Sequence, residues 1–131
     1  MAGETPYSER SGCPIATTLD LLGDKWSLVI IRDMMTGRRR FGEFERSPEG
    51  ITTNILADRL KRLERVGIVE RRPYQNNPTR YEYILTEMGN GLLPILQEIS
   101  RWGNRFIPGT WVPPESFMNR KPEELSLPRS G

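Results

Sequence analysis

The sequence predicts a mainly α-helical domain with one small β-hairpin, an α+β fold, in a chain of 131 residues. Apolar residues recur at helical spacing in several separate segments, the last of which covers residues 92–106. Only two short runs, 68–74 and 80–86, are rich in β-branched and aromatic residues, and the turn-rich segment QNNPT joins them. A hydrophobic fraction of 36% is ordinary for a globular chain of this length. One domain with one core is therefore expected.

The first two helices are indicated by their end signals. Pro14 suits the first turn of a helix that should end at Gly23. Asp24 can cap a second helix over residues 25–37, which is apolar almost all round and closes at Gly37. A helix with apolar residues on every side is expected in the centre of a small domain.

A short helix, a tight turn and an amphipathic helix should follow. Phe41 and Phe44 suggest one or two helical turns, and SPEG (47–50) is a turn sequence. Thr52 is placed as the N-cap of the next helix, flanked by an expected hydrophobic staple between Ile51 and Leu56. Its core stripe should consist of Leu56, Leu60 and Leu63, with Gly67 at its end.

The hairpin leads into the last predicted helix. Tyr81, Tyr83 and Leu85 alternate and should face inward. Thr86 is expected to cap one long helix that reaches Phe106, bent where Pro94 removes a backbone hydrogen bond. We divide the chain into a flexible arm (1–12), one folded domain (13–107) and a Pro-rich irregular tail (108–131), which Trp111 and Phe117 could anchor locally.

The order of these elements is informative. A short helix joined by a brief turn to a capped amphipathic helix is typical of a helix-turn-helix, and a hairpin directly after it forms a wing. Residues 38–80 carry 11 Lys and Arg against 6 Asp and Glu, a net charge of +5, whereas the rest of the chain has a net charge of −3. Clustered positive charge favours a polyanionic partner. The sequence therefore predicts a winged helix-turn-helix with a basic face.

Composition excludes several classes of function. The chain has one cysteine, Cys13, and no histidine. It can form no internal disulfide, no zinc site of Cys and His, and no triad that needs a histidine base. We therefore expect no metal, no cofactor and no enzymatic activity. The longest apolar run, 28–31, is far shorter than a bilayer span, and residues 1–12 lack the features of a signal peptide. We expect a cytoplasmic protein without membrane association.

Three segments carry a family resemblance. They are CPIATTLDLLGDKWSLVIIRDMMTGRRRFGEF, GITTNILADRLKRLERVGIVER and RYEYILTEMGNGLLPILQEISRWG, which lie between residues 13 and 103. With their Cys-Pro start, Gly-x-Lys-Trp, Arg-Arg-Phe and Leu-Thr-Glu-x-Gly, they resemble the HxlR-type bacterial transcriptional regulators, winged helix-turn-helix relatives of the MarR type. One departure is Arg38, which stands where that family has a proline.

The resemblance implies a homodimer that binds a double-stranded DNA operator. In such proteins the first and last helices typically form the dimer, and the apolar stripe of the last helix fits that role. The alternative is that this stripe packs only on its own domain. The expected interface residues are Ile15, Leu19, Leu92, Ile95, Leu96, Ile99, Trp102 and Phe106.

The outward face of the helix after Thr52 is the expected DNA-reading surface. Its first turn carries short hydrogen-bonding side chains, which can reach base edges in the major groove. We assign base contacts to Thr53 and Asn54, leave Thr52 between cap and phosphate ligand, and place Lys61 on the same face. An ordinary solvated helix start is the alternative. Asp58 could accept from cytosine or orient Arg62.

The remaining candidate contacts flank that helix. Arg39 and Arg40 are assigned to phosphate, although solvated surface charge explains either arginine nearly as well. At the hairpin tip we favour Arg80 for DNA and treat Asn76 and Asn77 first as turn-forming residues.

Cys13 and the dimer offer two routes of control. Cys13 precedes a helix N-terminus, where the helix dipole favours a thiolate, and the family resemblance implies an oxidant or electrophile sensor at this place. An inert, partly buried thiol is the alternative. A small-molecule effector between the long helices is a further means of control. The predicted function is a sequence-specific regulator on a pseudo-palindromic operator; the alternative is a winged-helix protein-interaction module that binds no DNA.

Overall fold

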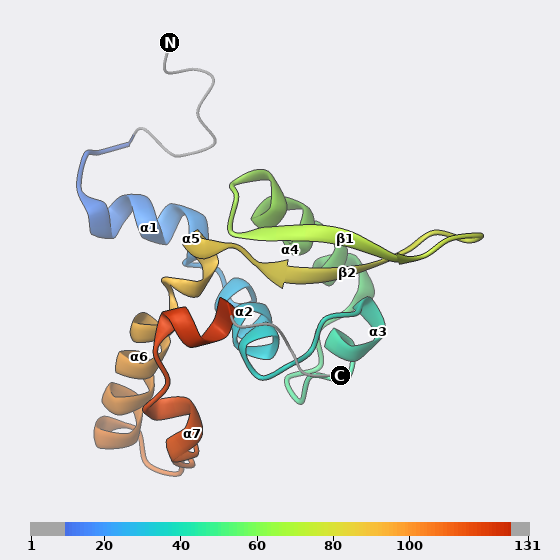
Figure 1. Cartoon of the computed structure of the whole chain (residues 1–131). Helices are drawn as coiled ribbons and strands as arrows, with labels where there is room; N and C mark the ends of the chain where they lie inside the picture. Colours follow the sequence, from blue (N-terminus) through green and yellow to red (C-terminus); the bar gives the residue numbers. More distant parts are fainter. Residues whose placement is uncertain (1–9, 127–131) are drawn as a thin grey trace.

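The computed structural model of the chain describes residues 10–126 and confirms the mainly α fold with one antiparallel hairpin (Figure 1). Residues 1–9 of the predicted arm and residues 127–131 of the predicted tail lie outside the described residues. The elements in chain order are α1 (Pro14–Leu22), α2 (Ser27–Met35), α3 (Phe41–Phe44), α4 (Thr53–Arg65), β1 (Val69–Gln75), β2 (Arg80–Leu85), α5 (Glu87–Asn90), α6 (Leu93–Phe106), α7 (Glu115–Met118) and the 3₁₀ helix η2 (Pro122–Ser126).

Helix α2 lies at the centre of the domain, as its apolar sequence predicts (Figure 1). Ile30 and Ile31 are completely buried there, and the fully buried Phe44 of α3 belongs to the same cluster. The second helix begins two residues later than predicted, at Ser27, and its N-cap position is Trp26 and not Asp24. Asp24 still acts in the manner of a cap from two residues before, because its carboxylate accepts from the backbone N–H groups of Trp26 (3.0 Å) and Ser27 (3.1 Å). Among residues 10–126, no helix combines the length and apolar character that a bilayer crossing needs.

The hairpin packs one end against the helices and projects the other beyond them (Figure 1). Val69 pairs with Leu85 at the buried end. Tyr83 and Leu85 pack against the core, as predicted. Tyr81 does not: it is only partly covered, and its ring lies 4.2 Å from the Arg71 guanidinium. The prediction for Tyr81 is wrong because alternation continues along a strand past the point where the core ends.

The last predicted helix is two helices. Thr86 caps the short α5 by accepting from the Gly89 N–H (3.3 Å), and Gly91 ends it. Gly89 has no room for a side chain, because an added Cβ would lie 2.4 Å from the carbonyl oxygen of Ile68, the residue before β1. Pro94 then falls in the first turn of α6, where its missing N–H costs nothing. The proline therefore marks the start of a helix instead of a bend within one.

The predicted irregular tail folds back onto the domain instead. We call residues 113–125 the C-terminal strap; they include α7 and most of η2. The buried Gln97 of α6 donates to the carbonyl oxygens of Phe117 (3.0 Å) and Arg120 (2.8 Å), and Arg120 donates to that of Met35 (3.1 Å). Phe117 is the anchor that the sequence predicts, whereas Trp111 is 72% exposed and is tied to α6 only through its carbonyl oxygen, which accepts from the Asn104 side chain (3.0 Å).

Candidate nucleic-acid interface

Helix α4 has the two faces that its sequence predicts. Leu56, Leu60 and Leu63 are buried, at most 2% exposed. The polar face is exposed and consists of Thr53, Asn54, Ala57, Asp58 and Lys61, preceded by the exposed cap Thr52. Ile51 and Leu56 are both buried in the core cluster, on either side of the cap. The start of α4 is thus fixed by the burial of Ile51 and Leu56 in the core, while its short polar side chains face solvent.

The three polar residues at the start of α4 differ in the hydrogen bonds that their side chains make. The Thr52 hydroxyl accepts from the Ile55 N–H (3.4 Å), which makes Thr52 the N-cap. The Thr53 hydroxyl donates to Glu45 (2.7 Å), just after α3. The Asn54 side chain makes no hydrogen bond within residues 10–126. Asn54 is therefore the residue of this turn whose amide is available to a partner.

A charged network fixes the turn between α3 and α4. The Arg32 guanidinium binds Glu49 (2.7 Å), the buried Asp33 (2.8 Å) and the hydroxyl of Ser47 (3.1 Å). The bond from Arg32 is the main cause that lowers the pKa of Glu49 to about 2. Because the 47–50 turn is tied to α2 in this way, α4 starts from a defined position.

A second link joins α4 to the start of α2. Arg59 donates to the Asp24 carboxylate (2.8 Å) and also pairs with Asp58. Burial alone would raise the pKa of Asp24, but hydrogen bonds from Ser27, Arg59 and the backbone outweigh it and lower the pKa to about 2. Asp58 therefore orients Arg59, its neighbour, whereas Arg62 donates to the Leu21 carbonyl oxygen (3.4 Å). The suggested Asp58–Arg62 pair is not formed.

The arginines before α3 lie against the hairpin, which sequence reasoning missed. The Tyr83 N–H donates to the Arg39 carbonyl oxygen (2.7 Å), and Arg40 forms a β-bridge with Glu82. The Arg39 guanidinium lies 3.8 Å from Glu82, and the exposed Arg40 guanidinium stacks over the Tyr74 ring at 3.6 Å. An aromatic residue on the outer part of β1 was the only sequence signal for that stacking.

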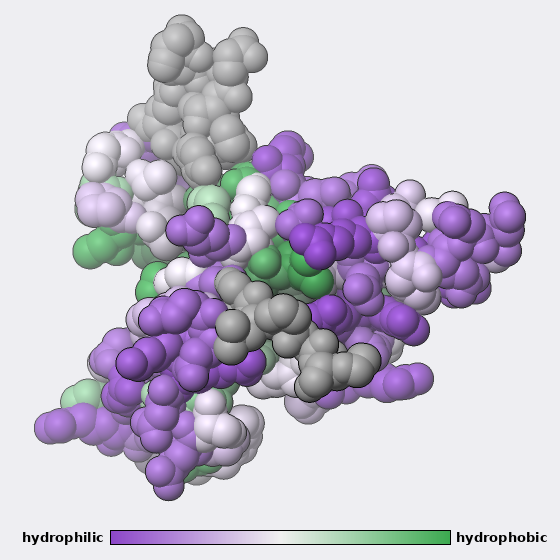
Figure 2. Space-filling model, viewed as in Figure 1, coloured by the Kyte–Doolittle hydropathy of each residue, from purple (hydrophilic) through white to green (hydrophobic). Residues whose placement is uncertain are grey.

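The wing tip carries the remaining candidate. Arg80 is exposed at the start of β2 and forms no ion pair within the described part of the chain. Asn77 has a φ of 54°, a backbone conformation that asparagine tolerates better than most residues. Its role as a turn-forming residue is confirmed. Figure 2 shows hydrophilic residues covering the projecting wing.

An exposed apolar face lies on the side of the molecule opposite the wing tip, on α1 and α6 (Figure 1). Trp102 and Phe106 contact each other there with ring centroids 5.4 Å apart. The exposed fractions are 70% for Ile15, 58% for Leu19, 43% for Ile95, 50% for Ile99, 61% for Trp102 and 58% for Phe106. Leu92 and Leu96 are a correction to the predicted interface: both are 8% exposed, because they face the core of the chain itself.

Cys13 stands at the N-terminus of α1 and is exposed. Its backbone N–H donates to the Ser11 hydroxyl (3.0 Å), and its carbonyl oxygen accepts from the Thr17 N–H (3.0 Å). The partial burial expected in the alternative interpretation is therefore wrong, whereas the choice between a sensor and an inert thiol stays a prediction. The thiol is open to reagents in solution.

Comparisons with known proteins agree with this geometry. The model of the HxlR-like helix-turn-helix family matches residues 21–110. YybR of Bacillus subtilis, named as an uncharacterized HTH-type transcriptional regulator, is 41% identical over 97 residues, which cover 74% of this chain and 78% of YybR. Rv3095 of Mycobacterium tuberculosis, named in the same way, is 36% identical over 118 residues, 90% of this chain and 74% of the relative.

Solved structures of similar proteins have the same fold. The redox regulator HypR in its reduced form has a TM-score of 0.66 and 39% identity, covering 76% of this chain and 100% of HypR. The reduced transcriptional regulator YodB from B. subtilis has a TM-score of 0.64 and 35% identity, covering 77% of this chain and 100% of YodB. The winged helix-turn-helix predicted from the order of elements is confirmed. The chain belongs to the HxlR-like helix-turn-helix family.

Proposed function

We propose that the chain is a homodimeric transcriptional regulator that reads a pseudo-palindromic DNA operator with the first turns of α4. The observation that carries this proposal is the exposed polar start of α4, where the Asn54 amide is uncommitted within the described chain. Asparagine can bond adenine through two hydrogen bonds in the major groove. Two copies of α4 would lie in successive major grooves, about 34–36 Å apart.

The contacts around α4 supply affinity without sequence information. Thr52 and Thr53 lie beside the N-terminal N–H groups of α4, which favour phosphate. Lys61 is exposed on the same helix, and Arg39 and Arg40 approach from the segment that runs along the hairpin. Arg80 on the wing tip would bind the backbone or enter a narrow minor groove.

The exposed apolar face of α1 and α6 is the proposed dimer surface. Ile15, Leu19, Ile95, Ile99, Trp102 and Phe106 are all large and at least 43% exposed. Leu92 and Leu96 are removed from the earlier assignment because they are buried in the protomer. Several large apolar residues exposed on one side of a monomer are uncommon and mark an interaction site where they form a single patch. In Figure 1, α1 and α6 lie on the side opposite the wing tip, so a dimer formed through them would leave the wing of each chain free for DNA.

Control would act by changing the spacing of the two α4 helices. The exposed Cys13 lies at the start of α1, next to the proposed dimer surface, so a modified thiol could alter helix packing. The similarity of the chain to HypR, which is described as a redox regulator, supports control through Cys13. A small-molecule effector is the second route. We place the regulator in the cytoplasm, where its DNA would be.

Binding of labelled duplex DNA, followed by fluorescence anisotropy at several salt concentrations, tests the proposal. We expect nonspecific affinity to fall steeply as salt rises, because each neutralised phosphate releases counterions. Absence of DNA binding at low salt would sink the proposal and favour the alternative, a winged-helix module that binds only proteins.

A further inference from the structure

The backbone of Arg40 is fixed from two sides. Its N–H donates to the Glu43 carboxylate of α3 (3.0 Å), and the residue forms a β-bridge with Glu82 of β2. Arg72 of β1 pairs with the same Glu82 in the hairpin, so β2 lies between Arg40 and β1. The segment before α3 is thereby attached to the free edge of β2.

The Arg40 side chain crosses β2 to reach β1. The central carbon of its guanidinium lies 3.6 Å from the centre of the Tyr74 ring, which is van der Waals contact. A cation in this position is attracted by the electron-rich face of the ring. The side chain of Arg40, as well as its backbone, therefore has a defined position.

Tyr74 is the extra residue of a β-bulge. Its neighbours Pro73 and Gln75 pair with two consecutive residues of β2, so Tyr74 has no partner on that strand. A bulge changes the direction of a side chain and is frequent next to binding sites. Tyr74 is 37% exposed and Arg40 is exposed as well, so the stacked pair lies at the surface of the wing.

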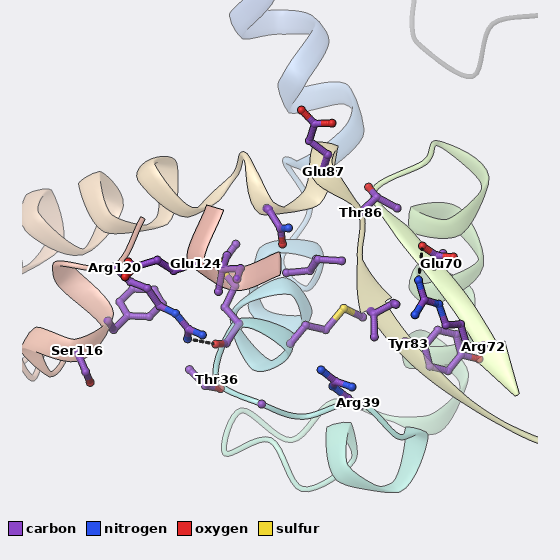
Figure 3. Close-up of a pocket in the computed structure, with 18 of the residues that line it drawn as sticks. Thr36, Arg39, Glu70, Arg72, Tyr83, Thr86, Glu87, Ser116, Arg120 and Glu124 are labelled. Atoms are coloured by element: carbon purple, nitrogen blue, oxygen red, sulfur yellow. Dashed lines mark hydrogen bonds and ion pairs between the residues drawn. The ribbon is translucent and has the colours of Figure 1, made fainter. Parts of the chain in front are cut away.

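Stacking leaves the hydrogen-bond donors of Arg40 free. The five N–H groups of a guanidinium lie in its plane, whereas the ring covers its face. Two other arginines beside the hairpin have carboxylate partners: Arg72 lies 3.5 Å from Glu70, and Arg39 lies 3.8 Å from Glu82. Figure 3 shows both of them at the groove between the hairpin and the C-terminal strap. Arg40 forms no ion pair within residues 10–126, so its donors are available to an anion.

We propose that Tyr74 is a positioning residue that holds the Arg40 guanidinium ready for a phosphate group of DNA. This role rests on the proposed function, in which Arg40 is a phosphate contact. One guanidinium can donate two parallel N–H bonds to phosphate oxygens. A guanidinium already held on a ring loses less freedom on binding than one that moves in solvent, so the ring adds affinity through Arg40. Phosphate carries no base information, so the effect is the same for every DNA sequence.

Fluorescence anisotropy with labelled duplex DNA compares the wild type, Tyr74→Phe and Tyr74→Leu. Phenylalanine keeps the ring face, whereas leucine is apolar without one. An exposed stack of this kind accounts for about threefold in binding, and for about tenfold in a dimer that uses two copies. We expect Tyr74→Leu to bind specific and nonspecific DNA about tenfold more weakly, and Tyr74→Phe to bind like the wild type. An equal loss in both variants would overturn the proposal, because it would assign the effect to the Tyr74 hydroxyl.

Arg40→Gln decides whether Tyr74 acts through Arg40. The guanidinium is absent in this background, so Tyr74→Leu should cause no further loss of DNA affinity. A general change in the hairpin would lower the affinity in both backgrounds, and a further loss as large as that in the wild type would therefore contradict the proposal. Urea unfolding of each protein establishes that folded states are compared.

Tyr81→Leu is the matched control on the same hairpin. It removes a second contact between an arginine and a ring, that of Arg71 at 4.2 Å, but Arg71 also lies 3.6 Å from the Glu64 carboxylate. We expect this variant to bind DNA nearly as tightly as the wild type. A loss equal to that of Tyr74→Leu would contradict a specific role of Tyr74.

The same measurements separate this role from the proposed function. If the wild type binds duplex DNA and Tyr74→Leu binds it equally well, the role of Tyr74 fails and the regulator stands. If the wild type binds no duplex DNA at low salt, the proposed function fails and the role of Tyr74 fails with it.

Discussion

Asp24 holds the first turn of α2 and the helix α4 together, and Asp24→Ala removes both links at once. The carboxylate accepts from two backbone N–H groups, from the Ser27 hydroxyl (2.6 Å) and from Arg59 (2.8 Å). Loss of a helix cap costs about 1 kcal/mol. Loss of a partly exposed ion pair adds about 1 kcal/mol at most. We therefore expect Asp24→Ala to lower the free energy of unfolding by about 2 kcal/mol at neutral pH.

The lowered pKa of Asp24 gives an independent magnitude. A fall in the pKa from 3.8 to about 2 corresponds to about 2.5 kcal/mol, since each pKa unit is worth about 1.4 kcal/mol. The folded state binds this proton less readily than the unfolded state. The stabilisation is therefore complete above about pH 4 and is lost as the pH falls through about 2. Asp24→Ala lacks it at every pH, so the difference between the two proteins should narrow in acid.

Urea unfolding followed by circular dichroism between pH 7 and about 2 measures this difference. Glu49 also titrates in this pH range, but it does so in the wild type and in Asp24→Ala, so its contribution cancels in the difference between their free energies of unfolding. Arg59→Ala keeps the cap and should lose only about 1 kcal/mol. Glu70→Gln, which removes an exposed ion pair with Arg72, is the control and should change little. A difference that stays constant down to pH 2 would refute the role of the Asp24 carboxylate.

The remaining predictions concern assembly, control and DNA contacts. Ile99→Asp should convert a dimer into monomers in sedimentation experiments, because a buried charge opposes association; Glu115→Arg on α7 is the control, and an unchanged dimer contradicts the assigned surface. Quinone treatment should release operator DNA from the wild type but not from Cys13→Ser, and equal release from both would exclude this thiol as a sensor. Arg80→Ala should weaken specific and nonspecific DNA binding alike and reduce the magnitude of the salt slope by about 1; a changed base preference would contradict a backbone role.

Local signals predicted most of the helical framework. Thr52 is the N-cap of α4, and Asp24 accepts from the first N–H groups of α2 although Trp26 is the N-cap of that helix. In both places a short oxygen-bearing side chain before an apolar stripe satisfies N–H groups that have no partner within the helix. Leu56, Leu60 and Leu63 recur at helical spacing, which places them on one face of α4, and that face is buried against the core. Such features depend on a few neighbouring residues, so sequence is sufficient to locate them.

Features that depend on distant contacts were missed. The strap has little helical propensity, and it folds because Gln97 and Met35 offer hydrogen-bond partners and the core accepts Phe117. Leu96 belongs to the same apolar stripe as Ile99, yet only the packing of α6 decides which of them remains exposed. The stacking of Arg40 on Tyr74 likewise joins residues that are far apart in the sequence.

The candidate site follows the same division. The exposed face of α4 could be predicted from the helix period, but the state of each side chain on it could not. Thr53 is held by Glu45, and Asp58 by Arg59, through contacts that only the folded chain creates. These contacts concentrate the expected base recognition on Asn54.

Selection of preferred duplexes from a random pool, performed in parallel for the wild type and Asn54→Ala, tests that recognition most directly. If Asn54 reads a base through the major groove, the wild type selects an inverted repeat. The variant then loses preference at one base pair in each half-site and about 1–3 kcal/mol of affinity. If the variant selects the same sequence with the same discrimination at every position, α4 does not read DNA through Asn54.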